Sequence, residues 1–176
     1  HIIFIETAMA ANGGVYSAIE PVRGKDGTRD PRQAYAPHGY DIVVDTPDLA
    51  KANNARVELI FERHYETTQR LQMPMLVGEW GAFGGWGEEI LPVAWGVVNI
   101  FEELKCSDTY WEYGKYLLDA AYLPALQRAV PARISGDLIS YDNDVDADAF
   151  ECTWREDPEV SAPTVISTST SRAQKP

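Results

Sequence analysis

The feature that most constrains the fold is a short apolar run, Met75-Leu76-Val77, which ends directly in Gly78-Glu79-Trp80-Gly81. A run that is apolar at every position is typical of a strand buried on both faces, as in a parallel sheet covered by helices. A carboxylate that closes such a strand lies at the edge where barrels of alternating strands and helices place their sites. Glu79 is therefore the first candidate for a functional residue.

Helical and strand-like patterns alternate around this segment. We expect helices over residues 47–72, 88–105 and 115–128, and short strands over residues 2–5, 75–77 and 108–112. Residues 33–41 are expected to form a short strand that runs into a polar, aromatic turn. Thr46, Pro47 and Asp48 suit the start of the first helix, and Pro74 follows its end. Strands and helices that alternate with short links predict parallel strands joined by crossover helices, and about four of the eight units of a barrel are present.

The pattern changes after Pro131. Residues 134–144, 150–154 and 163–170 are strand-like, and residues 167–176 form a polar tail that we expect to be frayed. We therefore expect an α/β fold in which residues 1–131 form half of a (β/α)8 barrel. Residues 132–176 would begin an all-β module. Because the chain starts within a strand, we also expect it to be the C-terminal piece of a longer protein.

Composition excludes some classes of function. The net charge of −12 argues against nucleic acid and against an anionic membrane as partners. The sequence holds no apolar run of about 18 residues, so we expect no transmembrane helix. The five Trp and nine Tyr suit a sugar-binding cleft, but they suit a core equally well. Cys106 and Cys152 are interpreted as two thiols rather than a bridge, and neither a metal nor a cofactor is expected.

The residues around Glu79 strengthen its candidacy over a merely capping or salt-bridging role. Tyr40 can donate its hydroxyl proton to a carboxylate and keep that carboxylate ionised. His38 can bind sugar hydroxyls, although both residues could equally belong to a packed turn. Trp111 is a candidate platform for a sugar ring, with a core position as the alternative.

Other polar and aromatic residues rank lower. Glu6, Trp80 and Trp86 are candidate binding residues, Glu6 because it also ends a strand and Trp80 as a pocket wall. His64 falls on a buried helical stripe and is expected in the core. Asp41 and Asp45 are expected to cap the following turn, with a position on the rim of the site as the alternative. The alternating acidic residues of segment 142–148 are expected in a solvated loop, because the spacing lacks the glycine and final Glu of a calcium loop.

Three segments together resemble glycoside hydrolase family five, and more narrowly its endoglycoceramidases. They are Tyr35-Ala36-Pro37-His38-Gly39-Tyr40-Asp41 with Val43-Val44-Asp45-Thr46, then Pro74 to Gly81, and finally Tyr110-Trp111-Glu112-Tyr113. The resemblance covers about residues 2–131 and implies the C-terminal half of the barrel, followed by part of a β-sandwich. It also implies a retaining mechanism with two carboxylates, in which Glu79 is the nucleophile and Tyr40 its hydrogen-bond partner. His38 would be a subsite residue and Trp111 the sugar platform.

The same resemblance exposes a gap. The family's acid/base is the Glu of an Asn-Glu-Pro motif on the fourth barrel strand, and this sequence contains no Asn-Glu-Pro. We therefore expect the acid/base Glu to come from the N-terminal half of the barrel, which belongs either to the same precursor or to a separate segment. The expected substrate is a glycosphingolipid cleaved between glycan and ceramide, in an extracellular or secreted protein. The alternatives are a β-glucanase or β-glucosidase, or a non-catalytic carbohydrate-binding fragment.

Overall fold

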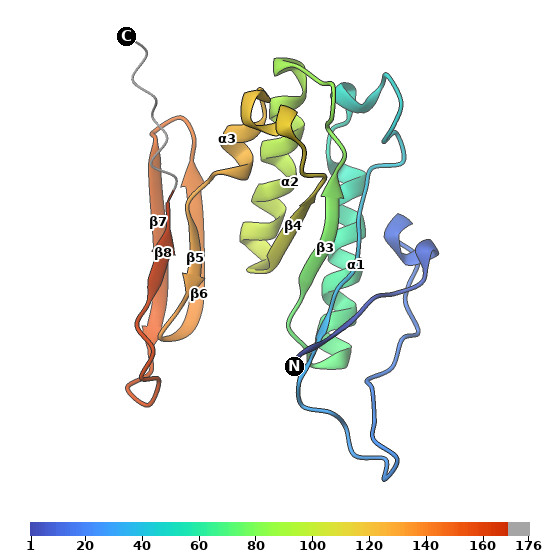
Figure 1. Cartoon of the computed structure of the whole chain (residues 1–176), viewed down its shortest axis with the longest axis vertical. Coiled ribbons are helices and arrows are strands. Elements are labelled where there is room, and N and C mark those ends of the chain that lie inside the picture. The colour runs from blue at the N-terminus through green and yellow to red at the C-terminus, as the bar shows by residue number, and fades with distance from the viewer. Residues whose placement is uncertain (169–176) are drawn as a thin grey trace.

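The computed structural model describes residues 1–168, which form two regions, one α/β and one all-β (Figure 1). The strands and helices of the α/β region are β1 (Ile3–Ile5), β2 (Gln33–Tyr35), α1 (Ala55–Leu71), β3 (Leu76–Gly81), α2 (Leu91–Leu104), β4 (Ser107–Trp111) and α3 (Leu123–Leu126). The all-β region holds β5 (Val130–Arg133), β6 (Gly136–Asp144), β7 (Ala149–Glu156) and β8 (Val165–Ser167).

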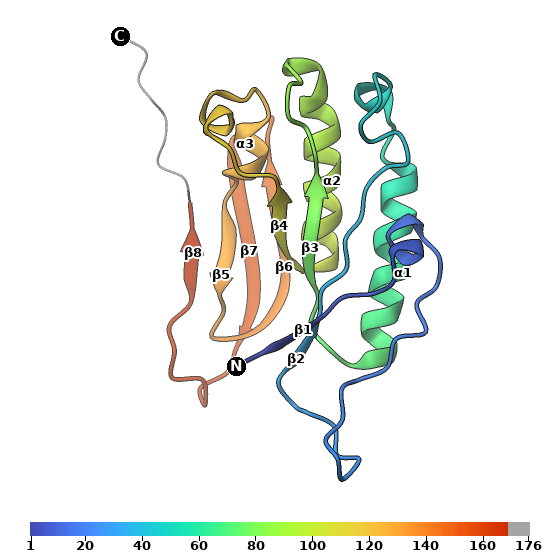
Figure 2. The same cartoon turned by 45° about the vertical axis from the view of Figure 1, so that its right-hand side comes forward.

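The first four strands lie side by side in chain order and run parallel (Figure 2). β1 pairs with β2, and β3 pairs with β4. Two isolated parallel bridges, Tyr35 with Met75 and His38 with Glu79, join the β2 segment to the β3 segment. All four carboxyl ends therefore lie at one edge. The predicted mixed α/β fold with parallel strands is confirmed.

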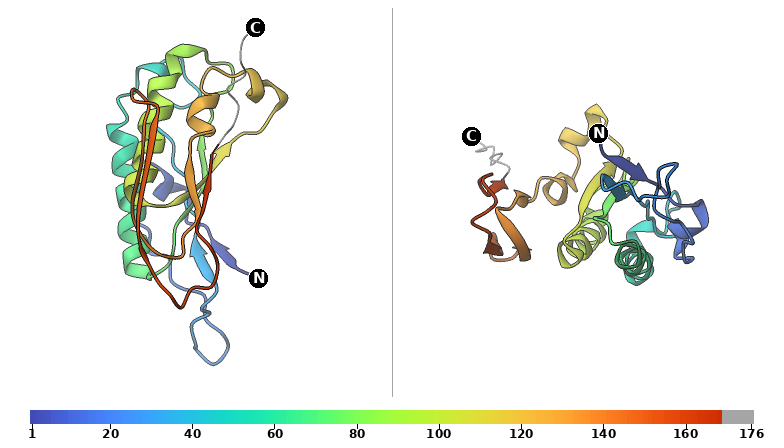
Figure 3. Two further views of the ribbon diagram at one scale, coloured as in Figure 1. Left: turned by 90° about the vertical axis from the view of Figure 1, so that its left-hand side faces the viewer. Right: turned by 90° about the horizontal axis from the view of Figure 1, so that it is seen from below.

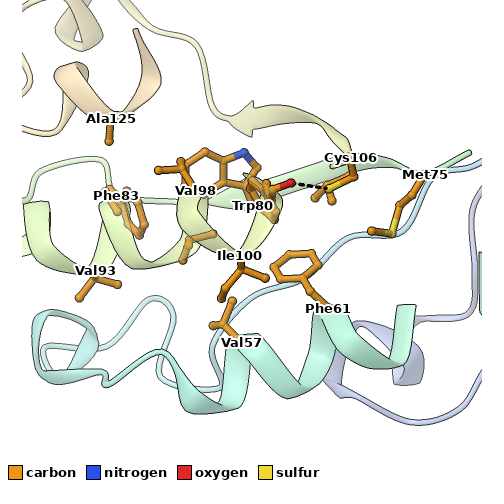
Figure 4. Close-up of a cluster of buried hydrophobic side chains, with 14 of the residues drawn as sticks. Val57, Phe61, Met75, Trp80, Phe83, Val93, Val98, Ile100, Cys106 and Ala125 are labelled. Carbon is orange, nitrogen blue, oxygen red and sulfur yellow. Dashed lines mark hydrogen bonds between the residues drawn. The ribbon is translucent and has the colours of Figure 1, made fainter. Parts of the chain in front are cut away.

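Helices α1 and α2 lie together on one face of these strands, as the view from below shows (Figure 3). Between helices and strands lies the aromatic core, where Phe101 packs edge-on against both Phe61 and Trp80 at ring distances of 4.8 and 5.2 Å. Figure 4 shows Trp80 and Phe83 in this cluster. Successive residues of a strand point to opposite faces. With Trp80 turned into the core, Glu79 is on the other face.

The first predicted helix begins later than its sequence suggests. Residues 47–52 form only a 3-10 turn, Leu49–Lys51, and α1 starts at Ala55. Asn54 has a left-handed backbone with φ of 62°, which interrupts a continuous helix. The side chain of Asn53 accepts a hydrogen bond from the Ala55 N–H, an alternative to helical bonding that Asn offers readily.

The third predicted helix is broken into two pieces, a 3-10 turn at Lys115–Asp119 and the single turn α3. Ala120 between them is extended, with ψ of 135°. Pro124 fits the first turn of α3, where its missing N–H costs nothing, but in the middle of one helix over residues 115–128 it would remove a helical hydrogen bond. The second predicted helix is confirmed as a 3-10 turn, Glu88–Ile90, that continues into α2.

The C-terminal strands form two antiparallel pairs, β6 with β7 and β5 with β8. The predicted strands at 134–144 and 150–154 correspond to β6 and β7. The predicted strand at 163–170 corresponds to β8 in part, and its last two residues lie outside the described range with most of the polar tail. No strand was expected at the position of β5, because Pro131 disfavours a strand assignment. β5 therefore runs across the boundary predicted between residues 131 and 132.

Two smaller expectations concern the thiols and the membrane. Cys106 and Cys152 are both free, the first buried and the second partly buried. Within residues 1–168, none of the helices combines the length and apolar character needed to cross a bilayer.

Candidate functional site

The candidate site consists of side chains at the carboxyl ends of the parallel strands. Glu6 follows β1 directly, His38 and Tyr40 follow β2, and Glu79 lies near the end of β3. The parallel bridge between His38 and Glu79 holds these two segments in register. The fold thereby brings together Glu6, His38, Tyr40 and Glu79, which are up to 73 positions apart in the sequence.

Glu79 is the centre of this cluster. Its Oε2 accepts a hydrogen bond of 3.0 Å from the Tyr40 hydroxyl, and the Nδ1 atom of His38 lies 3.2 Å from the same oxygen. The Glu79 side chain is 31% exposed, so its carboxylate is supported from the protein side and still reachable from solvent. A carboxylate held in this way can act as a nucleophile, a base or a ligand for hydroxyl groups.

Burial, the Glu79 hydrogen bond and the Glu79 charge all raise the pKa of Tyr40 well above its usual range. Tyr40 therefore keeps its proton at neutral pH and is the donor in the bond to Glu79. A hydrogen bond given to an ionised carboxylate stabilises that charged form.

Glu6 lies on the other side of the histidine. Its Oε1 is 3.6 Å from His38 Nδ1, so the Glu6 and Glu79 carboxylates approach the same nitrogen atom. The Glu6 side chain is 57% exposed and extends towards solvent. The structure thus places a second carboxylate beside the first.

Two glycines of the Glu79 motif have specific packing reasons. A Cβ on Gly78 would lie 3.0 Å from ring atoms of His38, so a larger residue would displace the imidazole from Glu79. Gly81 has φ of +102° and sits against the Tyr110 ring, where a side chain would clash. The glycines therefore serve the arrangement of neighbouring side chains.

The expectation that Trp80 walls a pocket is wrong. Trp80 is fully buried on the helix side of β3, because strand alternation turns it away from Glu79. Trp111 is 48% exposed at the end of β4, and Trp86 is partly buried against the core in the loop after β3. Neither position by itself assigns a binding role.

His64 is a core residue, as predicted, and it supports the cluster from behind. Its Nε2 lies 3.0 Å from the carbonyl oxygen of His38, and its Nδ1 lies 3.0 Å from the Tyr35 hydroxyl. A carbonyl can only accept, so neutral His64 donates from Nε2 and accepts the Tyr35 proton at Nδ1. This tautomer fixes the backbone that carries His38.

Burial lowers the pKa of His64 to about 4, from an ordinary value of 6.5. Because the folded protein resists protonation here, its stability is fully present above pH 6.5 and falls as the pH drops towards 4. We expect the free energy of unfolding to fall by about 1.4 kcal/mol per pH unit more than in a His64→Gln variant across this window. Urea denaturation at several pH values measures both slopes, and equal slopes would contradict the assignment.

Asp41 has the predicted turn-capping role and a partner that the sequence did not reveal. Its Oδ1 accepts from the Val43 N–H at 3.0 Å and from Arg56 at 2.7 Å. The Asp41 side chain is 1% exposed. This ion pair ties the segment after Tyr40 to the first turn of α1. Asp45, also predicted to cap, is exposed with φ of 62°.

The acidic segment 142–148 lies at the turn between β6 and β7, where Asp144 accepts from the Ala147 N–H. Across residues 1–168, no group of His, Cys, Asp and Glu is arranged to hold a metal ion.

Cavities alone do not locate the cluster. A cavity of about 540 Å³ lies between α2, α3 and the β6–β7 turn, lined in part by Trp95, Pro124 and Phe150. Beside Tyr40 and Gly81 there is a cavity of only about 20 Å³. The cluster is identified by its convergent polar groups.

Comparisons with known proteins locate the fold. No family model matches the chain, and no curated protein matches it significantly. Among solved structures, it is similar to endo-glycoceramidase II from Rhodococcus sp. in an iminocyclitol complex, with a TM-score of 0.75 and 21% identity over 94% of this chain and 40% of that chain. For the lactosyl-enzyme intermediate of the same protein the TM-score is 0.74, with 21% identity over 94% of this chain and 39% of that chain. For an endogalactoceramidase the TM-score is 0.50, with 16% identity over 86% of this chain and 30% of that chain.

These likenesses are too distant in sequence to carry an activity, but they establish the architecture. The chain spans about two fifths of the length of endo-glycoceramidase II and follows it over nearly all of its own length. The resemblance drawn from three sequence motifs is thereby confirmed for the fold: over most of its length, this chain is similar in fold to part of endo-glycoceramidase II.

Proposed function

We propose that the protein is a retaining glycoside hydrolase and that Glu79 is its nucleophile. The observation that carries the proposal is the Glu79 carboxylate at a strand end, bonded to Tyr40 at 3.0 Å and flanked by His38 at 3.2 Å. The fold likeness to endo-glycoceramidase II supports it. Glu79 would attack the anomeric carbon while the bond to the leaving oxygen breaks and that oxygen gains a proton. Water would then cleave the glycosyl–Glu79 ester and restore the carboxylate.

The proton for the leaving oxygen must come from a second group, which we place in the N-terminal half of the barrel. Within residues 1–168, β1 is paired with β2 alone and β4 with β3 alone, so each outer strand has a side free for a further strand. The chain's 40% coverage of endo-glycoceramidase II also leaves room for such a segment. In this proposal residues 1–131 are half of a (β/α)8 barrel, and residues 132–176 belong to a β-sandwich.

The proposed substrate is a glycosphingolipid, cleaved between its glycan and ceramide. The names of two similar solved structures, endo-glycoceramidase II and endogalactoceramidase, support this class. Trp111 would stack on a sugar ring, and His38, Glu6 and Trp86 would contact sugar hydroxyls or line the cleft. With this substrate we also propose that the protein is extracellular or secreted. The alternative within the same mechanism is a β-glucan or another β-glucoside.

The proposal is tested with the protein that carries the complete barrel. We expect it to release free glycan from lactosylceramide faster than glucose from cello- or laminari-oligosaccharides. NMR of the first product should show the β-anomer before mutarotation, because two displacements retain configuration. A first product with the α-anomer would contradict the nucleophile role. Faster cleavage of the glucan oligosaccharides would contradict the glycosphingolipid assignment and favour a β-glucan substrate.

Tyr40→Phe should lower kcat about 10- to 100-fold, since a hydrogen bond to a charged group is worth about 1.5–3 kcal/mol. KM should change little, because Tyr40 touches Glu79 and the loss falls on the chemical step. Tyr65→Phe on α1 is the matched control and should leave kcat unchanged. Equal kcat values for both variants would remove Tyr40 from the mechanism.

A non-catalytic carbohydrate-binding role is the second candidate, motivated by the absence of Asn-Glu-Pro from this sequence. Intact-mass analysis of the purified protein distinguishes the two. A polypeptide containing Asn-Glu-Pro supports the enzyme, whereas this chain alone, inactive but binding oligosaccharide, supports the binding role.

A further inference from the structure

A chain of buried polar contacts begins directly behind the strand that carries Glu79. The indole Nε1 of Trp80 donates to Asp108 Oδ2 at 3.0 Å. The other oxygen of Asp108 receives Arg128 at 2.7 Å. Trp80 is fully buried, and the Arg128 side chain is 4% exposed. The residue next to Glu79 is thus fixed by a charged pair inside the protein.

Arg128 has a second carboxylate partner on α2. Its Nε lies 3.3 Å from Glu102 Oε1, and the Glu102 side chain is 3% exposed. Burial raises the pKa of Glu102, against the lowering effects of Asn143 and Arg128. One guanidinium therefore stands between two largely buried carboxylates, where charge interactions are strong and directional.

Asn143 extends these contacts into the all-β region. Its backbone N–H and its side-chain amide both donate to Glu102, at 3.1 and 2.8 Å. The same amide group exchanges two further hydrogen bonds with the backbone of Ala129, just before β5. A continuous path of polar contacts therefore connects β6 with β3.

We propose that Arg128 is a positioning residue for Glu79, acting through Asp108 and Trp80, and that Asn143 makes the β6–β7 hairpin part of this support. This inference rests on the proposed nucleophile role of Glu79. The guanidinium fork holds Asp108 in one orientation, Asp108 holds the Trp80 indole, and strand alternation transmits that orientation to the Glu79 side chain. The β-region is then part of the catalytic unit rather than a separable attachment.

Arg128→Lys tests the proposal, because lysine keeps the charge and loses the fork. In the protein with its complete barrel, kcat should fall about 10- to 100-fold with KM nearly unchanged, the scale expected for a displaced catalytic group. Arg155→Lys, on exposed β7, is the matched control and should keep full activity. Assays are run well below the melting temperature of each variant. A merely structural role would lower Tm and leave kcat at the control value, which would overturn the proposal.

A second readout does not depend on activity. The indole N–H of Trp80 should exchange slowly with solvent in the unaltered protein and at least about tenfold faster in Arg128→Lys, measured by NMR. If the unaltered protein hydrolyses no glycoside but the indole exchange changes as expected, the proposed function fails and the contact chain stands. If Arg128→Lys does not fold, Trp80→Phe removes the same donor, and its unchanged kcat would also overturn the proposal.

Discussion

Replacing Glu79 with glutamine is expected to lower kcat by on the order of 10⁴-fold or more, the scale at which enzymes lose activity with their nucleophile. Glutamine has nearly the same shape as glutamate and can still accept from Tyr40. Its amide oxygen is a poor nucleophile, so the glycosyl–enzyme ester does not form. The expected change is in the chemical step, measured as kcat on a glycosphingolipid or an activated aryl glycoside.

Two control variants make this result specific. Glu88→Gln changes an exposed carboxylate a few residues later and should leave kcat unaltered. Glu6→Gln changes the second carboxylate near His38 and should cost far less than Glu79→Gln. A full loss in Glu6→Gln combined with a mild effect in Glu79→Gln would exchange the two roles.

Replacing Arg128 with methionine should lower the free energy of unfolding by about 3–5 kcal/mol, the usual cost of removing one partner of a buried ion pair. Methionine fills a similar volume but leaves Asp108 and Glu102 without their cation in a largely dry environment. Urea denaturation at neutral pH measures the change.

The control for this prediction is Arg155→Met, whose ion pair with Asp137 is exposed. Exposed pairs contribute about 0–1 kcal/mol, so this variant should remain close to the unaltered protein. The triple variant Arg128→Met, Asp108→Asn and Glu102→Gln should recover part of the loss, because it removes the uncompensated charges. If Arg128→Met and Arg155→Met have similar free energies of unfolding, the buried ion pairs contribute no more stability than the exposed one, which would contradict the prediction.

The sequence predicted the site's strand ends because that information is local. The run before Glu79 is apolar and flanked by glycines, and the position of a carboxylate at the end of such a strand follows from the fold class. The same logic applies to His38 and Tyr40. The geometry between the two segments, a 3.0 Å bond from Tyr40 to Glu79, required the structure because it depends on the register of two strands.

Errors arose where one residue decides between two local structures. Trp80 was expected at a pocket wall because it adjoins Glu79, but adjacent residues of a strand point to opposite faces. Asn54 and Ala120 each have a non-helical backbone that interrupts a helix that periodicity alone would continue. The first helix was therefore predicted with the wrong start, and the third was predicted as one helix where the structure has two short turns.

The supporting contacts could not be read from the sequence at all. Glu102 and Asn143 are 41 positions apart, and Asp108 and Arg128 are 20 apart. Neither separation matches a helical or strand period, so no local pattern marks them as partners. Arg56 and Asp41 are a similar case, with 15 positions between them. Their contacts exist only in the folded chain.

The most direct test of the account is to identify the residue that becomes covalently attached to sugar. A 2-deoxy-2-fluoro-β-glycosyl fluoride slows both displacements, but its fluoride leaves without a proton donor. The first step is then faster than the second, and the glycosyl–enzyme accumulates. The protein with its complete barrel is treated with this compound, digested and analysed by mass spectrometry. The account predicts one sugar per molecule, on the peptide that contains Glu79. A label on Glu6, or on any other residue, would contradict it.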